Sequence, residues 1–334
     1  MENKNEPKRI LTGDRPTGPL HLGHFVGSLQ NRVKLQNEFK TFIMVADVQA
    51  LTDNYDNPEK VRDNVYQVIQ DNIAAGIDPE KATFFIQSQI PQIAELTVFF
   101  MNLVSHAEVL RNPTVKTEIA QKGMTETVPF GFVGYPVSQA ADIHIVRADL
   151  VPVGEDQAPM LELADKIGER FNRIYKSQVF HKVQGKFGDV ARLVGTDGNA
   201  KMSKSLGNCI YLQDTPEQVH QRVSSMYTDP ARIRATDPGK VEGNPVFIYH
   251  DAFNANKEEV EDLKQRYRAG KVGDVEVKQK LEVAINAVLG PIRERREKYP
   301  LSLVKQIAEE GQRKVLQEAE TTMQMVREAM KIDY

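Results

Sequence analysis

Apolar and polar positions in the first part of the chain alternate between the spacing of strands and that of helices. Residues 9–12 (RILT), 41–48 (TFIMVADV) and 83–86 (TFFI) are short apolar runs that predict buried strands. Apolar side chains at helical spacing follow the first run from Phe25 and the second from Val61. This order of elements predicts a parallel sheet with helices on both faces.

The apolar positions beyond residue 206 follow helical spacing instead. Thr215 before a proline is typical of a helix start, because threonine caps the free backbone N–H groups there. Residues 277–289 contain the apolar stripe of another helix, and the Gly-Pro pair at 290–291 is expected to end it. The tail at 301–330 also predicts a helix.

The two patterns divide the chain into two predicted domains. A length of 334 residues is sufficient for one large domain and a smaller one. We expect residues 1–206 to form a Rossmann-like α/β nucleotide-binding domain with a parallel sheet. We expect residues 207–334 to form a helical domain.

Composition narrows the classes of protein that remain. The formal net charge is −3, so any contact with nucleic acid requires a local basic patch. Cys209 is the only cysteine, which excludes an intramolecular disulfide and a multi-cysteine metal site. The apolar stretches are too short for a membrane span, and residues 1–6 have no apolar leader. These features favour a cytoplasmic protein without a membrane partner.

The strongest local motif is PTGPLHLGH at residues 16–24, between the first predicted strand and helix. Ligands of open parallel sheets bind at the carboxyl ends of strands, where helix N-termini attract phosphate. Gly23 permits close approach to the backbone, and His21 and His24 can donate to charge developing on an α-phosphate. The alternative interpretation is a capped helix with two surface histidines. No GxxxxGK[ST] pattern occurs, which excludes a Walker loop.

A second motif, KMSKS at residues 201–205, follows a glycine-containing loop at 195–199. Two lysines on a mobile loop can close over a triphosphate and follow negative charge onto a leaving pyrophosphate. The alternative interpretation is a solvated basic loop.

Two further segments contain polar groups that suit a substrate. VPVGEDQ at residues 151–157 places two acids and an amide after a predicted strand, where they could bind ribose hydroxyls or an ammonium group. An acidic helix N-terminus is the alternative for this segment. Tyr135, Gln139 and Asp142 would share one face of a helix, and a buried Asp142 would need a donor as partner. A structural hydrogen bond is the alternative there.

These motifs together resemble a known family. HLGH resembles the first motif of class I aminoacyl-tRNA synthetases, and KMSKS matches the second letter for letter, in the same order along the chain. The segments GDRPTGPLHLGH, AADI and VPVGEDQ resemble the bacterial type of tryptophanyl-tRNA synthetase, over nearly the whole chain.

The resemblance implies a set of site residues. Catalytic roles are implied for His21, His24, Lys201 and Lys204. Contacts to ATP are implied for Arg15, Pro16, Thr17, Gly23, His24, Gly154, Glu155, Asp156, Leu193, Lys201, Met202, Ser203, Lys204 and Ser205. Contacts to the amino acid are implied for Asp142, Tyr135, Gln139, Gln157 and Gln49. Asp142 would accept the indole N–H, and Tyr135 and Gln157 would hold the ammonium group.

Some positions depart from the common bacterial pattern. Gln139 replaces a methionine, Gln49 a histidine and Arg15 a glutamine, so the predicted pocket is more polar than usual. Glutamine at position 139 also resembles archaeal-type tyrosyl enzymes, which makes a tyrosine–tRNA ligase the nearest alternative. A small-molecule adenylyltransferase and a non-catalytic RNA-binding paralogue are further alternatives.

The resemblance also implies the reaction and the partners. Tryptophan and ATP would give tryptophanyl-adenylate and pyrophosphate, and the amino acid would then pass to tRNA(Trp), with Mg²⁺ held mainly by the ATP phosphates. A homodimer is implied, formed through an insertion in the first domain, with the helical domain contacting the anticodon. A basic cluster could contact tRNA phosphates or form a solvated face; it comprises Arg293, Arg295, Arg296 and Lys298.

Overall fold

A computed structural model gives the fold of the chain. It describes residues 7–121, 123–124, 127–154, 157–187, 193–198, 202–229, 232, 234 and 236–334. Among these residues, no helix combines the length and the apolar character that crossing a membrane requires.

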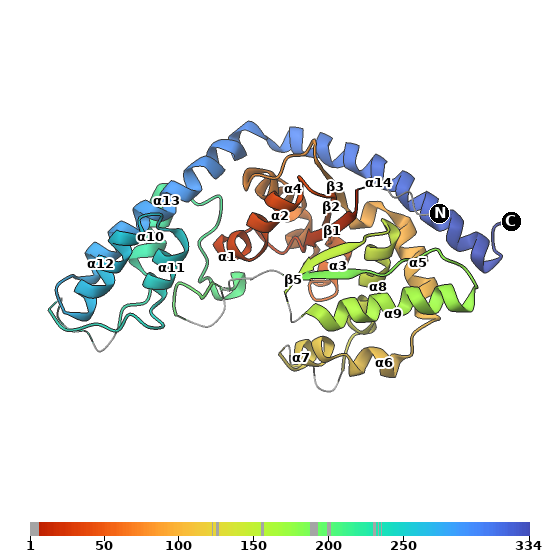
Figure 1. Cartoon of the computed structure of the whole chain (residues 1–334), viewed down its shortest axis with the longest axis horizontal. Helices are drawn as coiled ribbons and strands as arrows, with labels where there is room; N and C mark the ends of the chain where they lie inside the picture. The colour runs from red at the N-terminus through yellow and green to blue at the C-terminus, as the bar shows by residue number, and fades with distance from the viewer. Residues whose placement is uncertain are drawn as a thin grey trace.

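The centre of the molecule is a five-stranded parallel sheet, which confirms the predicted fold class (Figure 1). Its strands lie in the order β3-β2-β1-β4-β5. They are β1 (Arg9–Asp14), β2 (Lys40–Val45), β3 (Ala82–Ile86), β4 (Leu150–Val153) and β5 (Gln184–Phe187). β1 and β2 pair along their whole length, whereas β1 and β4 share only the pair Ile10↔Leu150. The strand order reverses between β1 and β4, which is where open α/β sheets bind ligands.

Helices connect the strands and form the second half of the chain. They are α1 (Leu22–His24), α2 (Gln30–Leu35), α3 (Asp47–Leu51), α4 (Pro58–Ala74), α5 (Pro91–Met101), α6 (His106–Arg111), α7 (Pro113–Gln121), α8 (Phe130–Ile145), α9 (Ala158–Ile174), α10 (Pro216–Ser224), α11 (Pro245–Phe253), α12 (Lys257–Arg268), α13 (Asp274–Lys298) and α14 (Leu301–Met330). A π-helical segment at Phe25–Leu29 joins α1 to α2. Thr215 caps α10 through the N–H of Gln218, which confirms the predicted start.

Both faces of the sheet are buried, as the alternation of strands and helices predicted. Leu11, Phe42 and Met44 pack on one face with apolar side chains of α5, α8 and α9. Ile43 and Val45 pack on the other face with α4. Because side chains alternate along a strand, neighbouring residues of β2 contribute to different cores.

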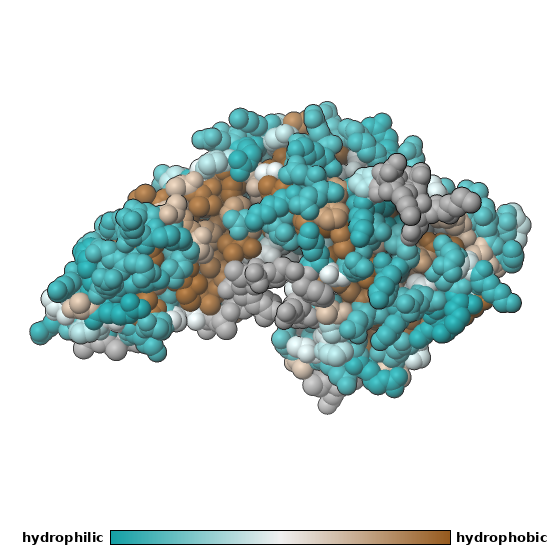
Figure 2. All heavy atoms as spheres, in the orientation of Figure 1, coloured by the Kyte–Doolittle hydropathy of each residue, from teal (hydrophilic) through white to brown (hydrophobic). Residues whose placement is uncertain are grey.

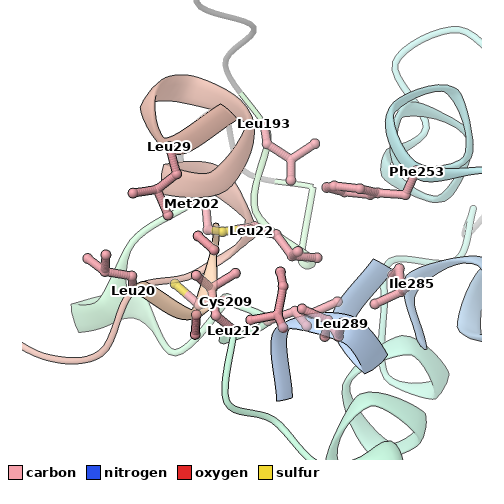
Figure 3. Close-up of a cluster of buried hydrophobic side chains, with 14 of the residues drawn as sticks. Leu20, Leu22, Leu29, Leu193, Met202, Cys209, Leu212, Phe253, Ile285 and Leu289 are labelled. Atoms are coloured by element: carbon pink, nitrogen blue, oxygen red, sulfur yellow. The ribbon is translucent and has the colours of Figure 1, made fainter. Parts of the chain in front are cut away.

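Helices α10 to α13 form a lobe beside the sheet, and its core continues into the loop before α1. Figure 3 shows Leu20 and Leu22 next to Met202, Cys209 and side chains of α13 in one buried cluster. The segments around residues 20–22 and 202–212 therefore rest on the helical lobe as well as on the sheet. Figure 2 shows the surface hollowed between this lobe and the sheet, on the side where α1 lies in Figure 1.

One predicted helix end is wrong. α13 continues through Gly290 and Pro291 to Lys298. An interior proline removes a backbone hydrogen bond and costs about 3 kcal/mol. Leu289 and Ile292, on either side of the pair, are almost completely buried, so apolar packing keeps the chain helical there.

The last helix, α14, leaves the lobe and runs back along the sheet (Figure 1). It lies so close to the edge strand β3 that a Cβ atom at Gly311 would stand 1.9 Å from the carbonyl oxygen of Phe84. Glycine is therefore required at this crossing. α14 covers the free edge of the sheet, which protects β3 from pairing with another chain.

Candidate active site

The HLGH and KMSKS motifs meet at the carboxyl end of β1. The segment after KMSKS runs antiparallel to the segment that leads into α1, with a bridge between His21 and Tyr211. The N–H of Leu22 donates to the carbonyl of Ile210 (2.9 Å), and the N–H of Leu212 donates to that of Leu20 (3.0 Å). Two motifs that are far apart in the sequence are thus joined through their backbones.

Lys204 closes the loop over the first motif. Its Nζ donates to the carbonyl oxygen of Gly18 at 2.6 Å. Gly18 has φ = 140°, and a Cβ atom there would stand 3.0 Å from Cδ of Lys204. Glycine at this position is therefore required both by the backbone conformation and by the approach of the lysine. Met202 of the same motif is buried, and its Sδ would stand 3.3 Å from a Cβ atom at Gly23.

The two histidines are neutral hydrogen-bonding groups. Their ring centroids lie 3.8 Å apart, and Nδ1 of His24 accepts the backbone N–H of His21 at 3.2 Å. His24 therefore has its ring proton on Nε2. Burial and the nearby charges of His24 and Lys204 lower the pKa of His21 to about 2. Burial lowers the pKa of His24 to about 4, although Asp14 acts in the opposite direction. Both rings can donate hydrogen bonds without bringing a full charge.

Lys204 is a cation beside the two histidines. Burial lowers the pKa of Lys204 to about 8, although Asp14 and Asp71 act in the opposite direction. An anionic ligand beside Nζ would favour the charged ammonium and raise that pKa again. The remaining KMSKS residues are only partly described: Lys201 and the side chain of Ser205 lie outside the described residues, and the N–H of Ser203 donates to Oδ1 of Asn208 at 2.7 Å.

A cavity of about 130 Å³ lies over the ends of β1 and β2, on the side of α8. Its lining comprises Leu11, Thr12, Gly13, Asp14, Arg15, Met44, Ala46, Gln49, Gln139, Asp142, Ile143 and Val151. Four of the residues predicted from the sequence therefore meet in one cavity. Arg15 also forms an ion pair with Asp53.

Asp142 is the buried acid of this cavity. Its carboxylate accepts hydrogen bonds from Nε2 of Gln49 (2.7 Å) and from Nε2 of Gln87 (2.8 and 3.0 Å). Burial raises the pKa of Asp142 to about 7, against the effect of these two amides. An ionised carboxylate can accept about four hydrogen bonds, so a further donor can be accommodated. Gln87 is not among the residues predicted from the sequence, since a glutamine after a strand has no motif of its own.

The other predicted amino-acid contacts lie apart from this cavity lining. The hydroxyl of Tyr135 donates to Oε2 of Glu118 at 2.7 Å. Gln157 begins α9, and its backbone N–H donates to the carbonyl of Gly154 at 3.0 Å. Glu155 and Asp156 lie outside the described residues.

A second cavity of about 90 Å³ lies on the α2 side of the sheet, beside β1, β4 and β5. Thr12, Gly27, Ser28, Asn31, Arg32, Pro152, Val153, Gly154 and Lys186 line it. Among the described residues of this lining, Gly154 is the one predicted ATP contact. The predicted contacts Pro16 and Thr17 lie in the loop beyond β1, where the N–H of Thr17 donates to the carbonyl of Arg15 (2.8 Å). Leu193 is buried in the core that contains Met202.

The family of the chain follows from a comparison with known proteins. The family described as tRNA synthetases class I (W and Y) matches residues 2–290. The chain belongs to this family of class I aminoacyl-tRNA synthetases. Two curated relatives are each 51% identical: the tryptophan–tRNA ligase of Clostridium longisporum, over 97% of both chains, and that of Lactococcus lactis, over 97% of this chain and 98% of the relative.

Solved structures of other class I synthetases share the fold. A tryptophanyl-tRNA synthetase from Campylobacter jejuni, complexed with ADP and tryptophan, has a TM-score of 0.86 at 29% identity, over 97% of this chain and 99% of that one. A tyrosyl-tRNA synthetase from Archaeoglobus fulgidus has a TM-score of 0.65 at 23% identity, over 88% and 92% of the two chains. The second likeness concerns the fold alone.

Three arginines of the predicted basic cluster have partners within the protein. Arg293 donates to the carbonyl of Asp214 (2.9 Å) and Arg295 to that of Ala74 (2.7 Å). Arg296 pairs with the buried Asp71, whose other oxygen accepts the N–H of Leu20 at 2.8 Å. These arginines therefore fasten α13 to α4 and to the motif loops. The interpretation as a purely solvated face is therefore wrong for these three half-buried arginines, because protein acceptors replace solvent. Contact with tRNA phosphates stays a prediction.

Proposed function

We propose that this chain is a tryptophan–tRNA ligase. The tryptophan carboxylate attacks the α-phosphorus of ATP, the bond to the β-phosphate oxygen breaks, and pyrophosphate leaves. A terminal ribose hydroxyl of tRNA(Trp) then attacks the carbonyl carbon, and AMP leaves. The observation that supports this most strongly is the cavity that contains the buried Asp142. It lies at the end of β1, the strand that leads into the loop to which Lys204 is hydrogen-bonded. The chain is also 51% identical to a tryptophan–tRNA ligase.

The amino-acid half of the site is proposed to select the indole. Asp142 is a fixed acceptor because two amides hold its carboxylate, and an indole N–H is a donor without any acceptor function. Gln139 and Gln49 would line the ring. The ammonium contacts of Tyr135 and Gln157 stay predictions; Tyr135 would have to share its hydroxyl with Glu118.

The nucleotide half is proposed to bind ATP through the motif loops. His21, His24 and Lys204 would donate to the phosphates, with Gly23 allowing close approach and Gly154 beside the nucleotide. Lys201, Glu155 and Asp156 are proposed to contribute from outside the described residues. Among the described residues, no cluster of three histidines, cysteines or acids is placed to hold a metal ion. Mg²⁺ is proposed to be held mainly by the phosphates, whose charge it would neutralise.

We also propose a role for each of the two predicted domains and the partners that each would bind. Residues 1–206 would catalyse the reaction and form a homodimer, and residues 207–334 would contact the anticodon of tRNA(Trp) in the cytoplasm. Val98 and Met101 on α5 and Phe130 at the start of α8 support the dimer, because they are large apolar side chains left exposed. Light scattering should give twice the chain mass of 37.7 kDa.

Isotope exchange between pyrophosphate and ATP tests the proposed function. Exchange should depend on tryptophan and should be ~10²-fold or more weaker in kcat/KM with tyrosine, because the smaller phenol cannot both reach the Asp142 carboxylate and fill the space of the indole. The second candidate, tyrosine activation, is favoured only by Gln139. Exchange with tyrosine but not with tryptophan would establish that candidate and exclude the first.

A further inference from the structure

The two cavities of the site share one wall. Beyond the single pair Ile10↔Leu150, β1 and β4 diverge, and a cavity lies on each side of the end of β1. Thr12 lines both cavities. Asp14 lines the amino-acid cavity and Arg32 lines the cavity on the α2 side. Because the side chains of Asp14 and Arg32 are hydrogen-bonded to each other, the wall between the two cavities contains a buried ion pair.

Asn72 of α4 completes this network. Arg32 donates through Nη1 to Asp14 (2.5 Å) and to Oδ1 of Asn72 (3.0 Å), and through Nη2 to Asp14 and to the carbonyl of Gly13 (3.1 Å each). Asn72 Nδ2 donates in turn to Oδ2 of Asp14 at 3.0 Å. All four terminal N–H groups of the guanidinium thus have partners. Nε of Arg32 is buried without a hydrogen-bond partner, so the four terminal bonds hold the guanidinium in place. Because these bonds leave few alternative arrangements, a shift of Asp14 must move Arg32.

We propose that Asp14, Arg32 and Asn72 form a positioning network that couples amino-acid binding on one side of β1 to nucleotide binding on the other. This inference rests on the proposed function, because it takes the cavity that contains Asp142 as the amino-acid half of that site. An amino acid in this cavity would press on the end of β1, where Asp14 lies. Through Asp14 and Arg32, that contact would fix α2 and the wall of the second cavity.

The charge of Asp14 explains why the pair must stay intact. The side chains of Asp14 and Arg32 are 8% and 5% exposed, so water screens their charges little. Asp14 also acts electrostatically on His24 and on Lys204. Without Arg32, its carboxylate would present an uncompensated negative charge to the groups proposed to receive phosphate. The pair therefore gives the wall a fixed shape without a net charge.

Equilibrium binding measures this coupling directly. The dissociation constant of a non-hydrolysable ATP analogue is measured for the full chain with and without tryptophanamide, which lacks the reacting carboxylate. The wild-type ratio of the two constants is expected to be about fivefold or more, as is usual for coupled sites. Arg32→Lys and Asp14→Asn are expected to bring the ratio close to one. Arg32→Lys, whose position is not in the amino-acid cavity lining, should still bind tryptophanamide alone.

A buried arginine far from the site provides the matched control. Arg232 in the helical lobe donates to Asp274 (3.0 Å) and to the carbonyl of Asp237 (2.8 Å), much as Arg32 does in its own network. Arg232→Lys should lower the melting temperature and leave the ratio at the wild-type value. The double variant Asp14→Leu/Arg32→Met removes both charges and so preserves folding. It should also lose the coupling.

Two results would overturn the inference. The first is a wild-type ratio of one, and the second is an unchanged ratio in the folded single and double variants. Neither result touches the proposed function, which fails separately when the wild-type chain shows no tryptophan-dependent pyrophosphate exchange.

Discussion

The two halves of the site meet at the end of β1 and have opposite electrostatic states. In the amino-acid half, the buried Asp142 carboxylate already has two amide partners. In the nucleotide half, the histidines of HLGH are neutral and Lys204 has a pKa of about 8. The Asp142 carboxylate is therefore held in position before a ligand binds. The second half gathers donors whose pKa values are lowered mainly by burial.

This difference indicates what each half requires of its ligand. A preorganised acceptor selects a ligand by geometry, because a poorly matched group leaves the carboxylate with an unmade hydrogen bond. A cluster of donors with lowered pKa values binds an anion most favourably, because the anion raises those pKa values again. Specificity is therefore expected to depend on the Asp142 half, and rate on the Lys204 half.

The largest effect is expected in the nucleotide half. Lys204→Ala should lower kcat of pyrophosphate exchange by ~10²–10³, the usual effect of removing one donor to charge that develops in the transition state. Tryptophan binding should change little. Lys278→Ala is the matched control, since Nζ of Lys278 also donates to main-chain carbonyls (2.7 and 3.0 Å) but lies in the helical lobe. Equal losses in the two variants would contradict the assignment.

The amino-acid half should respond differently. Asp142→Ala removes a buried acceptor, which costs about 1–3 kcal/mol, or roughly 5- to 150-fold in kcat/KM for tryptophan. The loss should appear mainly in KM, and discrimination against tyrosine should weaken. Asp142→Asn keeps the volume of the side chain, and its kcat/KM for tryptophan should lie between those of the wild type and Asp142→Ala. An unchanged kcat/KM for tryptophan in the alanine variant would remove Asp142 from the proposed pocket.

The pH dependence of kcat/KM should distinguish the two halves of the site. On either side of the optimum, kcat/KM should fall about tenfold per pH unit. Asp142 becomes protonated as the pH falls through about 7, so kcat/KM for tryptophan should decline on the acid side. Lys204 loses its proton as the pH rises through about 8, so kcat/KM for ATP should decline on the alkaline side. Asp142→Asn should abolish only the acid decline and Lys204→Arg only the alkaline one. Loss of both declines in one variant would mean that the halves titrate together.

The smallest effect is expected for the polar lining of the amino-acid cavity. Gln139→Met should change kcat/KM for tryptophan about fivefold or less, because a neutral hydrogen bond contributes about 1 kcal/mol. Any activity with tyrosine should fall, since the phenol would lose a partner. Pyrophosphate exchange measures kcat/KM for tryptophan and for tyrosine. A gain of tyrosine activity would show that Gln139 excludes tyrosine.

The parallel sheet and the two motifs could be predicted because they depend on local signals. Alternation of apolar runs with helical spacing places the strands, and the chemistry of HLGH and KMSKS is contained in a few adjacent residues. Thr215 caps its helix through the N–H of a residue three positions on, so that start is also local.

Long-range partners could not be predicted in this way. Gln87, Arg32 and Asn72 gain their roles from residues 55, 18 and 58 positions away, and no short pattern marks them. The arginines of α13 were taken for a surface patch because the sequence does not reveal that Asp71 is buried opposite them. Gly290 and Pro291 were taken for a helix end because local propensity neglects the packing of Leu289 and Ile292.

Ligand fluorescence tests the central claim most directly, because the chain contains no tryptophan residue. The protein is passed through gel filtration after incubation with tryptophan, ATP and pyrophosphatase. Indole fluorescence should elute with the wild-type protein, as tryptophanyl-adenylate, and should be greatly reduced in Asp142→Ala. Excess tyrosine should not displace it. Elution of the protein without indole fluorescence, or its loss upon addition of tyrosine, would contradict the account.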